Sequence, residues 1–369
     1  MTTTYMIAGG GTGGHIFPAL AIGQALRDQV PEARIVFVGT RYGMETSLIP
    51  DAGEKLLTLP IRGLLGKSML KKAAMIWRIP ASFLLSVIYL LRFRPKVVIG
   101  VGGYASAPLL WTAAMLRIPT LIQEQNAFPG LANRMCAKVA QLACLGFEEA
   151  GRHLACAGIV TGNPVRRDFC EGKPWSRKRP LLLVLGGSQG ARSLNERLPV
   201  VLQRVIEPEM QLEVVHQCGR KYVAEVEQAY RDAPFPVRVV SFIEDLSKLM
   251  DDVRLVVCRS GASTIAELKL VRVPAVLIPF PAATHDHQTF NAKSLAALGA
   301  AELVPENDLD RLESLLQALL GEPERLQKMV TAYPRTRVNS ADQVARLALQ
   351  LQERRPVKDI LKEQQAHVS

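Results

Sequence analysis

The feature that most limits the possible folds of this chain is a glycine-rich loop that occurs twice, each time directly after a short apolar run. Residues 9–15 read GGGTGGH after the run 5–8, and residues 186–192 read GGSQGAR after the run 181–185. A strand that passes through a glycine turn into a helix is the opening unit of a parallel α/β sheet. Two such openings predict two Rossmann-like domains that face each other across a cleft.

Short apolar runs with helical stretches between them support this α/β interpretation. They lie at residues 5–8, 35–38, 97–101, 120–123, 181–185, 212–216, 237–240, 255–258 and 275–278. With 369 residues, 48% of them hydrophobic, the chain is long enough for two cores. We therefore expect parallel sheets built from βαβ units.

The expected domain junction is the stretch 162–180, which is rich in turn-forming and charged residues. We predict an N-terminal domain over residues 1–162 and a C-terminal domain over residues 163–340. The tail carries apolar residues at helical spacing, among them Val344, Leu347 and Leu351. We expect residues 341–369 to form a closing helix that packs back on the first domain.

The cysteines and the apolar stretches exclude several classes of protein. The six cysteines form no C-x-x-C pair and have no histidine at metal-ligand spacing, so we expect neither a zinc site nor disulfides, and a reducing compartment fits best. The start of the chain shows no basic region or cleavage site typical of an export signal. The uncharged stretch 79–91 has 13 residues, too few to cross a bilayer. Glycines and a proline break up the stretch 97–116, and we expect no transmembrane helix in either.

The first glycine loop formally matches the dinucleotide-binding pattern G-x-G-x-x-G. Such a site also needs an acid at the end of the second strand to hold the ribose, but this strand ends Val38-Gly39-Thr40-Arg41. An NAD site is therefore disfavoured, although Arg41 leaves NADP possible. The glycines also suit a tight turn alone, or the close approach of a phosphate to backbone N–H groups.

Several side chains near these loops have both a functional and a purely structural interpretation. His15 has an imidazole suited to accept a hydroxyl proton, or it braces the helix. Arg166, at the domain junction, is suited to clamp a phosphate or to form a surface salt bridge. Ser188 in the second loop is suited to donate to a diphosphate. Glu267, on a helix after a third loop, would bind ribose hydroxyls or is an ordinary acid near a helix start.

Taken together, these strings resemble the MurG family, two-domain UDP-N-acetylglucosamine transferases of the GT-B type and of glycosyltransferase family 28. The matching segments are GGGTGGH (9–15), GTRYGMET (39–46), VGGYASAP (101–108), EQNAFPG (124–130), GNPVR (162–166), GGSQGAR (186–192), RSGASTIAE (259–267) and HQTFNA (287–292). They follow one another in order over nearly 300 residues. The family acts on undecaprenyl-diphospho-muramyl-pentapeptide, a lipid-linked precursor of bacterial peptidoglycan.

The resemblance implies a role for each matching segment. Ser188 and Arg166 would bind the diphosphate of UDP-GlcNAc, the backbone near Ile243 its uracil, and Gln288 its sugar. The helix start after the third loop would bind phosphate and ribose; it comprises Ala262, Ser263, Thr264, Ile265, Ala266 and Glu267. In the first domain, Thr12, Gly13, Gly14 and Asn126 would approach the sugar and the acceptor. The family often has two glutamines where this chain reads His287-Gln288.

The implied reaction is an inverting transfer of N-acetylglucosamine to the C4 hydroxyl of MurNAc in lipid I, which gives lipid II and UDP. The transition state resembles the oxocarbenium ion of glycoside hydrolysis, and one general base is required. His15 is the first candidate for this base and Glu124 the second. Because Arg166, Ser188 and helix N-termini would meet the charge on the diphosphate, we expect no metal and no cofactor.

A basic, partly apolar segment would bring the protein to its lipid-linked acceptor. The chain carries a net charge of +11, and residues 55–123 hold ten Lys or Arg and no Asp or Glu. A region of this kind lies on anionic lipid, or is a solvated face over a core helix. The expected membrane patch comprises Lys67, Met69, Lys71, Lys72, Trp77, Arg78 and Phe83. We expect a peripheral protein on the cytoplasmic face of the inner membrane, with other cell-wall synthesis proteins as candidate partners and no nucleic acid.

Two other functions stay open at this point. One is a different UDP-sugar-dependent GT-B enzyme, such as a glycolipid synthase or a UDP-sugar epimerase, against which the loops 101–108 and 124–130 argue by resemblance. The other is a UDP-sugar-binding module that docks on membrane without catalysis; His15 and Glu124 argue against it.

Overall fold

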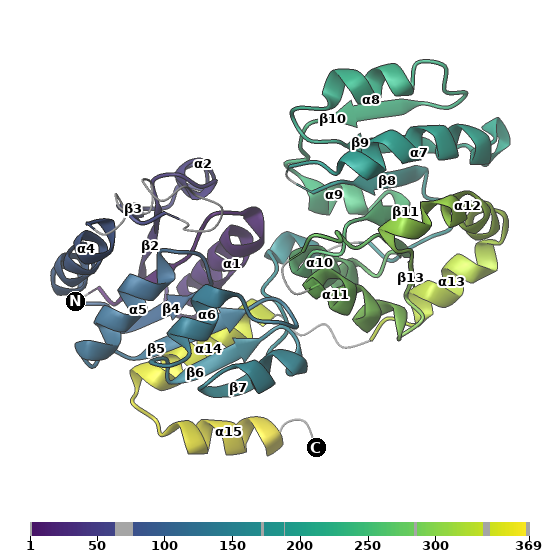
Figure 1. Cartoon of the computed structure of the whole chain (residues 1–369). Helices are drawn as coiled ribbons and strands as arrows, with labels where there is room; N and C mark the ends of the chain where they lie inside the picture. The colour runs from purple at the N-terminus through teal and green to yellow at the C-terminus, as the bar shows by residue number, and fades with distance from the viewer. Residues whose placement is uncertain are drawn as a thin grey trace. The chain divides into compact units, whose positions relative to one another are not determined.

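The computed structural model describes residues 2–62, 77–170, 173–187, 189–283, 286–334 and 340–366. The chain divides into two compact units, the first made of Met1–Arg166 together with Asn339–Ser369 and the second of Arg167–Val338. Each unit is built on its own parallel sheet (Figure 1). Two parallel-sheet α/β units confirm the predicted fold class.

The first unit contains a seven-stranded sheet within its described residues, in the order β3-β2-β1-β4-β5-β6-β7. Every neighbouring pair is parallel. The strands are β1 (Thr4–Ala8), β2 (Arg34–Thr40), β3 (Leu56–Leu59), β4 (Val97–Gly100), β5 (Thr120–Glu124), β6 (Leu142–Leu145) and β7 (Ala157–Val160). β1 lies between β2 and β4, so the chain changes direction across the sheet at this point. Ligands of open α/β sheets bind at such a switch point, beyond the carboxyl ends of the strands.

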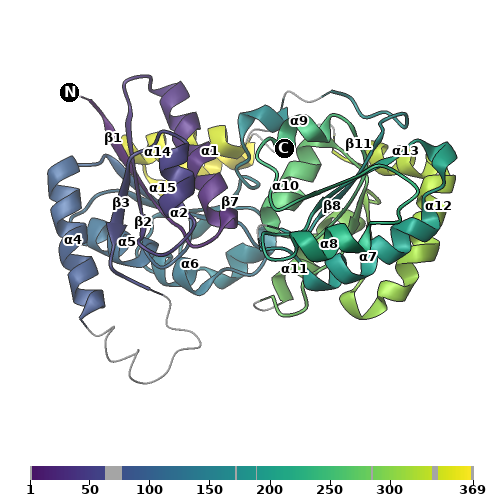
Figure 2. The same ribbon diagram turned by 90° about the horizontal axis from the view of Figure 1, so that it is seen from above.

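Successive side chains of each strand point into two different cores, because strand side chains alternate between faces. On one face, Ile7 belongs to a core formed with helices α1 (Gly13–Gln29), α14 (Ser340–Gln352) and α15 (Val357–Ala366). On the other, Met6 and Ala8 belong to a core formed with α4 (Arg78–Phe93), α5 (Ser106–Met115) and α6 (Leu131–Cys136). Figures 1 and 2 show this three-layer arrangement. The helix α2 (Glu45–Asp51) follows β2.

The end of the chain returns to the first unit, where α14 packs against α1. We expected one continuous helix in this tail, but the structure has two. α14 ends at Gln352, and Arg354 adopts a left-handed conformation with φ 57°. Pro356 follows, and a proline lacks the N–H that a continued helix needs.

The second unit contains a six-stranded parallel sheet within its described residues, in the order β10-β9-β8-β11-β12-β13. The strands are β8 (Leu181–Leu185), β9 (Glu213–Gln217), β10 (Val237–Val240), β11 (Val253–Cys258), β12 (Ala275–Leu277) and β13 (Ala301–Leu303). One face packs against α7 (Arg192–Val205), α8 (Val223–Ala229), α12 (Leu312–Gly321) and α13 (Pro323–Thr331). The other helices are α9 (Leu246–Met250), α10 (Ala262–Val271) and α11 (His287–Ala296). β8, between β9 and β11, repeats the switch point of the first unit.

Short 3-10 helices connect several of these elements. They are η1 (Glu148–His153), η2 (Arg167–Cys170), η3 (Pro208–Met210) and η5 (Glu306–Arg311). Within the described ranges, every helix is too short or too polar to span a lipid bilayer.

Four strands of the structure were not predicted: β3, β6, β7 and β13. Each has only three or four residues. β6 reads LACL and has no β-branched or aromatic residue, and β3 is mostly half-buried. Residues of this kind carry little intrinsic preference for a strand, so their neighbours in the sheet determine the conformation.

Candidate active site

The glycine loop after β1 is held at the carboxyl ends of the first sheet by close backbone contacts. The Ser106 hydroxyl donates to the carbonyls of Ala8 and Gly102, at 2.9 Å each. Gly103 has φ +86°, and a Cβ there would lie 2.5 Å from the carbonyl oxygen of Gly10. Only glycine fits this position, because an L side chain would be strained and would overlap the loop. The loops after β1 and β4 are therefore packed directly together.

His15 lies in the first turn of α1 and its ring packs on the loop after β4. A Cβ at Gly102 would lie 2.7 Å from the His15 Cδ2 atom, so glycine leaves space for the imidazole. The ring is half-buried. One face of the ring is therefore held against the backbone at Gly102.

The N-terminus of α1 presents backbone N–H groups at this edge. The N-cap residue Thr12 is extended, and its carbonyl accepts from the N–H groups of His15 at 3.1 Å and Ile16 at 3.2 Å. Within the described residues, the N–H groups of Gly13 and Gly14 have no hydrogen-bond acceptor. A helix of 17 residues carries a partial positive charge at this end. The arrangement is suited to an anion.

Glu124 is the last residue of β5, and only 1% of its surface is exposed. Its Oε1 atom accepts from the backbone N–H of Asn126 at 2.9 Å and from the Asn126 side chain at 3.3 Å. Its Oε2 atom accepts from the N–H of Gly130 at 3.1 Å and from Asn133 Nδ2 at 2.9 Å. Burial raises the pKa of this carboxyl, and the four donors oppose that shift. The geometry is that of a carboxylate that shapes the loop 125–130.

A buried amide network extends from this loop and was not among the predicted features of the site. Gln125 Nε2 donates to the carbonyl of Val101 at 2.8 Å and to Gln123 Oε1 at 2.6 Å. Asn163 accepts from Gln123 Nε2 at 3.0 Å and donates to the carbonyl of Gln125 at 2.8 Å. Two of these residues lie in matching segments, 124–130 and 162–166. Their presence in those strings was the one available signal.

Arg166 is the last residue of the contiguous part of the first unit. Its guanidinium carbon lies 5.5 Å from the centroid of the Phe17 ring, a cation–π arrangement. Phe17 in turn lies under Gly13, where a Cβ would be 3.1 Å from the ring. Arg166 is thereby placed beside the first turn of α1.

In the second unit, the glycine loop after β8 is equally tight. Gly187 and Gly190 have φ +82° and +77°, and a Cβ at Gly190 would overlap the carbonyl oxygen of Cys218. Ser188, the predicted diphosphate ligand, lies outside the described residues. Gln217 connects this loop with the predicted uracil segment, since its Nε2 donates to the carbonyl of Gly187 at 3.1 Å and its Oε1 accepts from the N–H of Ile243 at 3.0 Å.

The third loop leads into α10, whose N-cap is Gly261. The predicted ligands Ala262, Ser263, Thr264, Ile265, Ala266 and Glu267 are its first six residues. Ile265 is 1% exposed, so only its backbone can reach a ligand. The buried Ser263 hydroxyl has no hydrogen-bond partner among the described residues. The helix N-terminus again suits a phosphate.

Two residues connect the third loop with neighbouring elements. The Ser260 hydroxyl donates to the backbone carbonyl of Gln288 at 2.8 Å, at the start of α11. The Gln288 side-chain oxygen accepts from the N–H of Phe280 at 2.9 Å. Arg259 forms an ion pair with Glu306 and donates to the carbonyls of Ile278 and Pro279. Arg259 thus serves to hold the loops.

The predicted residues consequently gather in two places, one in each unit. Those of the first unit lie at the carboxyl ends of β1 and β5, together with the helix that follows β1; they are Thr12, Gly13, Gly14, His15, Glu124 and Asn126. In the second unit, the described residues that are predicted to bind the donor lie around the carboxyl ends of β10, β11 and β12. In the described ranges, His, Cys, Asp and Glu side chains nowhere gather in a set of three that could hold a metal.

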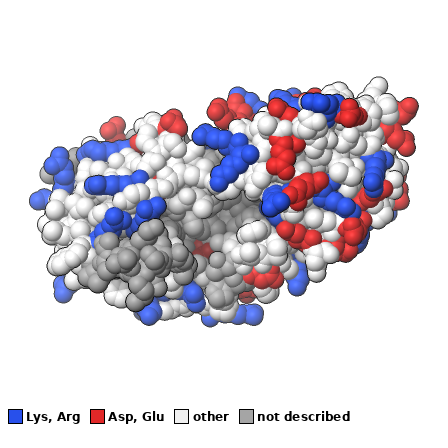
Figure 3. Space-filling model, turned by 45° about the horizontal axis from the view of Figure 1, so that its top comes forward, with Lys and Arg blue, Asp and Glu red and all other residues white. Residues whose placement is uncertain are grey.

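Four of the predicted patch residues, Lys67, Met69, Lys71 and Lys72, lie outside the described residues. Trp77 is 80% exposed, Phe83 is half-buried, and Arg78 lies 5.9 Å from the centroid of the Tyr42 ring. α4 also exposes Leu84, Ile88 and Leu91, an apolar row that the sequence analysis missed. On the face of the first unit seen in Figure 3, Lys and Arg side chains (blue) lie among uncharged residues and are more prominent than Asp and Glu (red).

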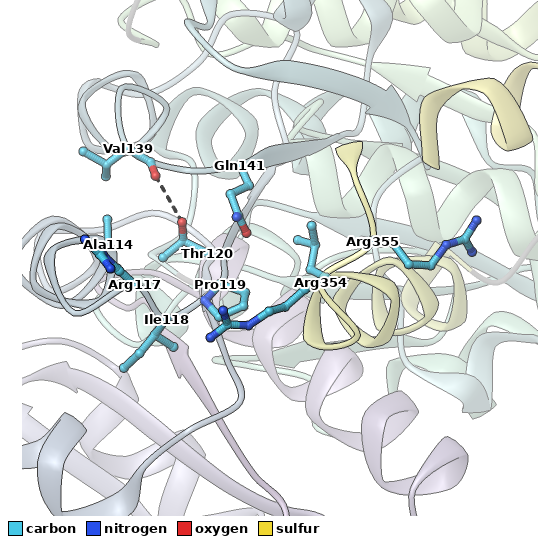
Figure 4. Close-up of a pocket in the computed structure, with 10 residues that line it drawn as sticks. Ala114, Arg117, Ile118, Pro119, Thr120, Val139, Gln141, Arg354 and Arg355 are labelled. Carbon is cyan, nitrogen blue, oxygen red and sulfur yellow. Dashed lines mark hydrogen bonds between the residues drawn. The ribbon is translucent and has the colours of Figure 1, made fainter. Parts of the chain in front are cut away.

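A cavity of about 380 Å³ lies away from these sites, at the amino ends of β5 and β6. It is lined in part by Arg117, Pro119, Gln141 and Arg354, and Figure 4 shows Arg354 extending toward Pro119. Glu124 lies at the opposite end of β5, so this cavity belongs to a different edge of the sheet.

The comparisons with known proteins agree with this geometry. Residues 5–144 match the Glycosyltransferase family 28 N-terminal domain, and residues 181–346 match the Glycosyltransferase family 28 C-terminal domain. The two matches fall on the two sheets and include both glycine loops. The fold and the site thus define a two-domain glycosyltransferase.

Individual relatives narrow this class. The UDP-N-acetylglucosamine--N-acetylmuramyl-(pentapeptide) pyrophosphoryl-undecaprenol N-acetylglucosamine transferase of Anaeromyxobacter sp. (strain K) is 41% identical over 357 residues, which cover 95% of this chain and 93% of the relative. The crystal structure of Acinetobacter baumannii MurG has a TM-score of 0.74 and 32% identity, and the match covers 94% of this chain and 99% of that one. The chain belongs to the MurG family of glycosyltransferases.

A more distant structure shares the fold alone. A UDP-N-acetylglucosamine 2-epimerase from Listeria monocytogenes, described as putative, has a TM-score of 0.71 but 14% identity; the match covers 96% of this chain and 98% of that one. Sequence identity at this level carries no information on the reaction.

Proposed function

We propose that this protein transfers N-acetylglucosamine from UDP-GlcNAc to the C4 hydroxyl of MurNAc in undecaprenyl-diphospho-MurNAc-pentapeptide, which yields lipid II and UDP for peptidoglycan synthesis. The observation that carries the proposal is the match over nearly the whole length of both chains to a relative whose name states this transfer. The N-termini of α1 and α10, each preceded by a glycine-containing loop, support binding of two phosphate-bearing substrates.

The second unit is proposed to bind the donor. The N-terminus of α10 would bind phosphate, and Glu267 would bind the ribose one turn further on. Ser188 and Arg166 would bind the diphosphate, with the sugar at Gln288. The N–H of Ile243 donates to the side-chain oxygen of Gln217. Uracil recognition by that backbone N–H therefore requires the Gln217 side chain to release it.

The first unit is proposed to bind the acceptor and the membrane. The N–H groups of Gly13 and Gly14, which have no acceptor among the described residues, lie at the positive end of α1 and support binding of the lipid diphosphate or of the reacting sugar. Asn126, which Glu124 holds by two hydrogen bonds, would approach the sugar. This assigns residues 1–162 to the acceptor domain, residues 163–340 to the donor domain, and residues 341–369 to the helical tail.

His15 is the proposed general base. Its ring lies in the first turn of α1, beside the loop where the acceptor hydroxyl would arrive. The hydroxyl oxygen attacks the anomeric carbon on the side opposite the diphosphate, the proton passes to the imidazole, and the bond to UDP breaks. All four acceptor positions of Glu124 are already occupied by N–H donors, which supports a positioning role for it rather than proton transfer.

The membrane assignment rests on the first unit as well. Trp77, Leu84, Ile88 and Leu91 expose apolar surface on or beside α4, which also carries Arg78 and Arg92. An acceptor with an undecaprenyl chain stays in the bilayer, so the enzyme would bind the cytoplasmic face of the inner membrane as a peripheral protein. Other proteins of cell-wall synthesis are the partners that such a site would meet.

The deciding experiment supplies UDP-GlcNAc and lipid I without added divalent metal, and measures UDP release together with the disaccharide lipid. The proposal predicts that UDP appears only when lipid I is present. Conversion of UDP-GlcNAc to another UDP-sugar without acceptor would instead support the epimerase alternative. Binding of UDP-GlcNAc with no product would support a non-catalytic module.

A variant of the base completes the experiment. His15→Gln should lower kcat about 10²-fold to 10⁴-fold, the usual contribution of a general base, with unchanged UDP-GlcNAc affinity. Near-full turnover by this variant would move the base role to another residue.

A further inference from the structure

A buried carboxylate outside the proposed mechanism contacts the first glycine loop. Glu45, the first residue of α2, has no exposed surface. Its Oε2 atom accepts from the backbone N–H of Gly11 at 2.7 Å. Its Oε1 atom accepts from the backbone N–H and from the hydroxyl of Thr40, at 2.8 and 2.7 Å. The carboxylate thus joins the loop after β1 to the end of β2.

Three glycines from two segments leave space for this carboxylate. A Cβ at Gly10 would lie 2.5 Å from the Glu45 Cδ and Oε1 atoms, and a Cβ at Gly39 would lie 2.6 Å from its Cγ atom. A Cβ at Gly43 would overlap Oε2, the oxygen that accepts from Gly11. Removal of a carboxylate from water is costly, and a side chain in this position is retained only with good hydrogen bonds. The loop is therefore built around the Glu45 side chain.

We propose that Glu45 is a positioning residue for the acceptor side of the reaction, because it holds the loop 9–14 in the conformation that presents the N–H groups of Gly13 and Gly14. The inference rests on the proposed acceptor role of this loop. Glu45 also engages the Gly11 N–H, so the amides left for an anion begin beyond that residue. Gly11 has φ +97° and no neighbour within 4 Å of its Cβ position, so the loop has little other restraint at this residue.

The test uses Glu45→Gln, which keeps the size of the side chain. Its single oxygen can still accept from Thr40, but its amide group then faces the Gly11 N–H, and two donors repel. We expect faster amide hydrogen exchange in the segment 9–15. We also expect a loss on the order of 10²-fold in kcat/KM for the lipid acceptor, the effect of a misplaced site, with unchanged UDP-GlcNAc affinity.

Two further variants separate this role from general destabilisation. Gly43→Ala keeps the carboxylate and its charge but displaces Oε2, and it should reproduce both effects of Glu45→Gln. Glu32→Gln removes an equal charge at an exposed position of the same unit and should leave both readouts unchanged. The thermal midpoint of each variant shows how much of any loss is due to unfolding.

The outcomes distinguish this inference from the proposed function. The inference is wrong if folded Glu45→Gln and Gly43→Ala exchange the amide hydrogens of the segment 9–15 as slowly as the wild-type protein does. It is also wrong if these variants lose UDP-GlcNAc affinity and kcat/KM for the acceptor to the same extent. If the wild-type protein does not use lipid I, the proposed function fails, but hydrogen exchange still tests the positioning of the loop.

Discussion

The burial of Glu124 and its hydrogen bonds suggest two different roles for this residue. A buried glutamate beside an active site is a natural candidate for a base, and burial raises the pKa of its carboxyl. However, both oxygens already accept two hydrogen bonds each, from donors on the loop 125–130 and on α6. A base must have an acceptor position free for the substrate proton.

Glu124→Gln separates these two roles. The amide nitrogen of the new side chain would face two donors, so we expect a loss of about 1–3 kcal/mol in the free energy of unfolding, together with reduced turnover through a displaced Asn126. Urea unfolding and steady-state kinetics measure the two effects. A variant with wild-type stability and no turnover would identify Glu124 as the base.

His216 in β9 gives the second unit a defined dependence on pH. The imidazole is buried between the Tyr230 hydroxyl and Asn195 Oδ1, each at 3.1 Å, and burial lowers its pKa from 6.5 to about 4. Below pH 6.5 the unfolded chain binds a proton at His216, whereas in the folded protein the imidazole stays neutral down to about pH 4. Stability is therefore lost as the pH falls through this window.

The shifted pKa of His216 contributes at most about 3 kcal/mol to the free energy of unfolding, at about 1.36 kcal/mol per pKa unit. His216→Gln keeps an amide that can bond to both partners but does not titrate. The free energy of unfolding of the variant should depend less on pH between 6.5 and 4 than that of the wild-type protein, measured by urea unfolding at each pH. Parallel curves for the two proteins would contradict the assignment.

Among the elements, α4 carries a row of exposed apolar residues. Leu84, Ile88 and Leu91 are 64%, 47% and 60% exposed and lie at spacings of four and three residues, on one face of the helix. Soluble helices ordinarily direct such a row at the core. On α4, the core side is instead occupied by Ser82, Ser86 and Leu90.

Replacement of Leu84 and Leu91 by Gln should weaken binding to vesicles of anionic lipid at least tenfold, since each leucine side chain contributes about 1.5–3 kcal/mol when it leaves water. Flotation of vesicles with bound protein measures this. Val200, 44% exposed on α7, is the matched control: Val200→Gln should leave vesicle binding unchanged. Equal binding by the double variant would exclude α4 from the membrane surface.

The elements also show which parts of the molecule were predictable. Glycine loops and β-branched runs are local signals, so β1, β2, β8 and the helices after both glycine loops followed from the sequence. β6 and β13 did not, because the sheet around them determines their conformation. The same holds for Glu45: the search for an acid at the end of β2 stopped at Arg41, and nothing local shows that a residue five positions past Thr40 returns to that strand end.

For the site too, residues in short local strings could be predicted, whereas contacts between distant positions could not. The glycine loop pointed to His15, and the resemblance predicted roles for Asn126 and for the start of α10 from strings of residues. The hydrogen-bond network of Gln123, Gln125 and Asn163 joins positions far apart in the chain, and only the strand order β5-β6-β7 brings them together.

At the scale of the whole molecule, the first unit depends on the last residues of the chain. Val344, Leu347 and Leu351 of α14 and Ile360 of α15 are almost fully buried in the core that includes α1. At about 1.5–3 kcal/mol for each side chain, their contribution is comparable to the roughly 5–15 kcal/mol stability of an entire domain.

A chain that ends at Val338 should therefore lose the fold of the first unit and keep that of the second. Hydrogen exchange should show fast exchange in β1, β4 and β5 but protection in β8 and β11. A matched deletion of residues 367–369, which leaves both helices intact, should change neither unit. Full protection of β1 in the chain that ends at Val338 would contradict this dependence.

The return of the chain also sets an order of events during synthesis. The first unit is begun first, but α14 emerges from the ribosome only after the whole of Arg167–Val338 has been made. At roughly 5–20 residues per second, the apolar face of α1 waits on the order of ten seconds or more for its cover. The second unit can complete its fold during that interval. The half of the enzyme that would meet the membrane is thus the last to mature, and it is the half that a chaperone would have most time to protect.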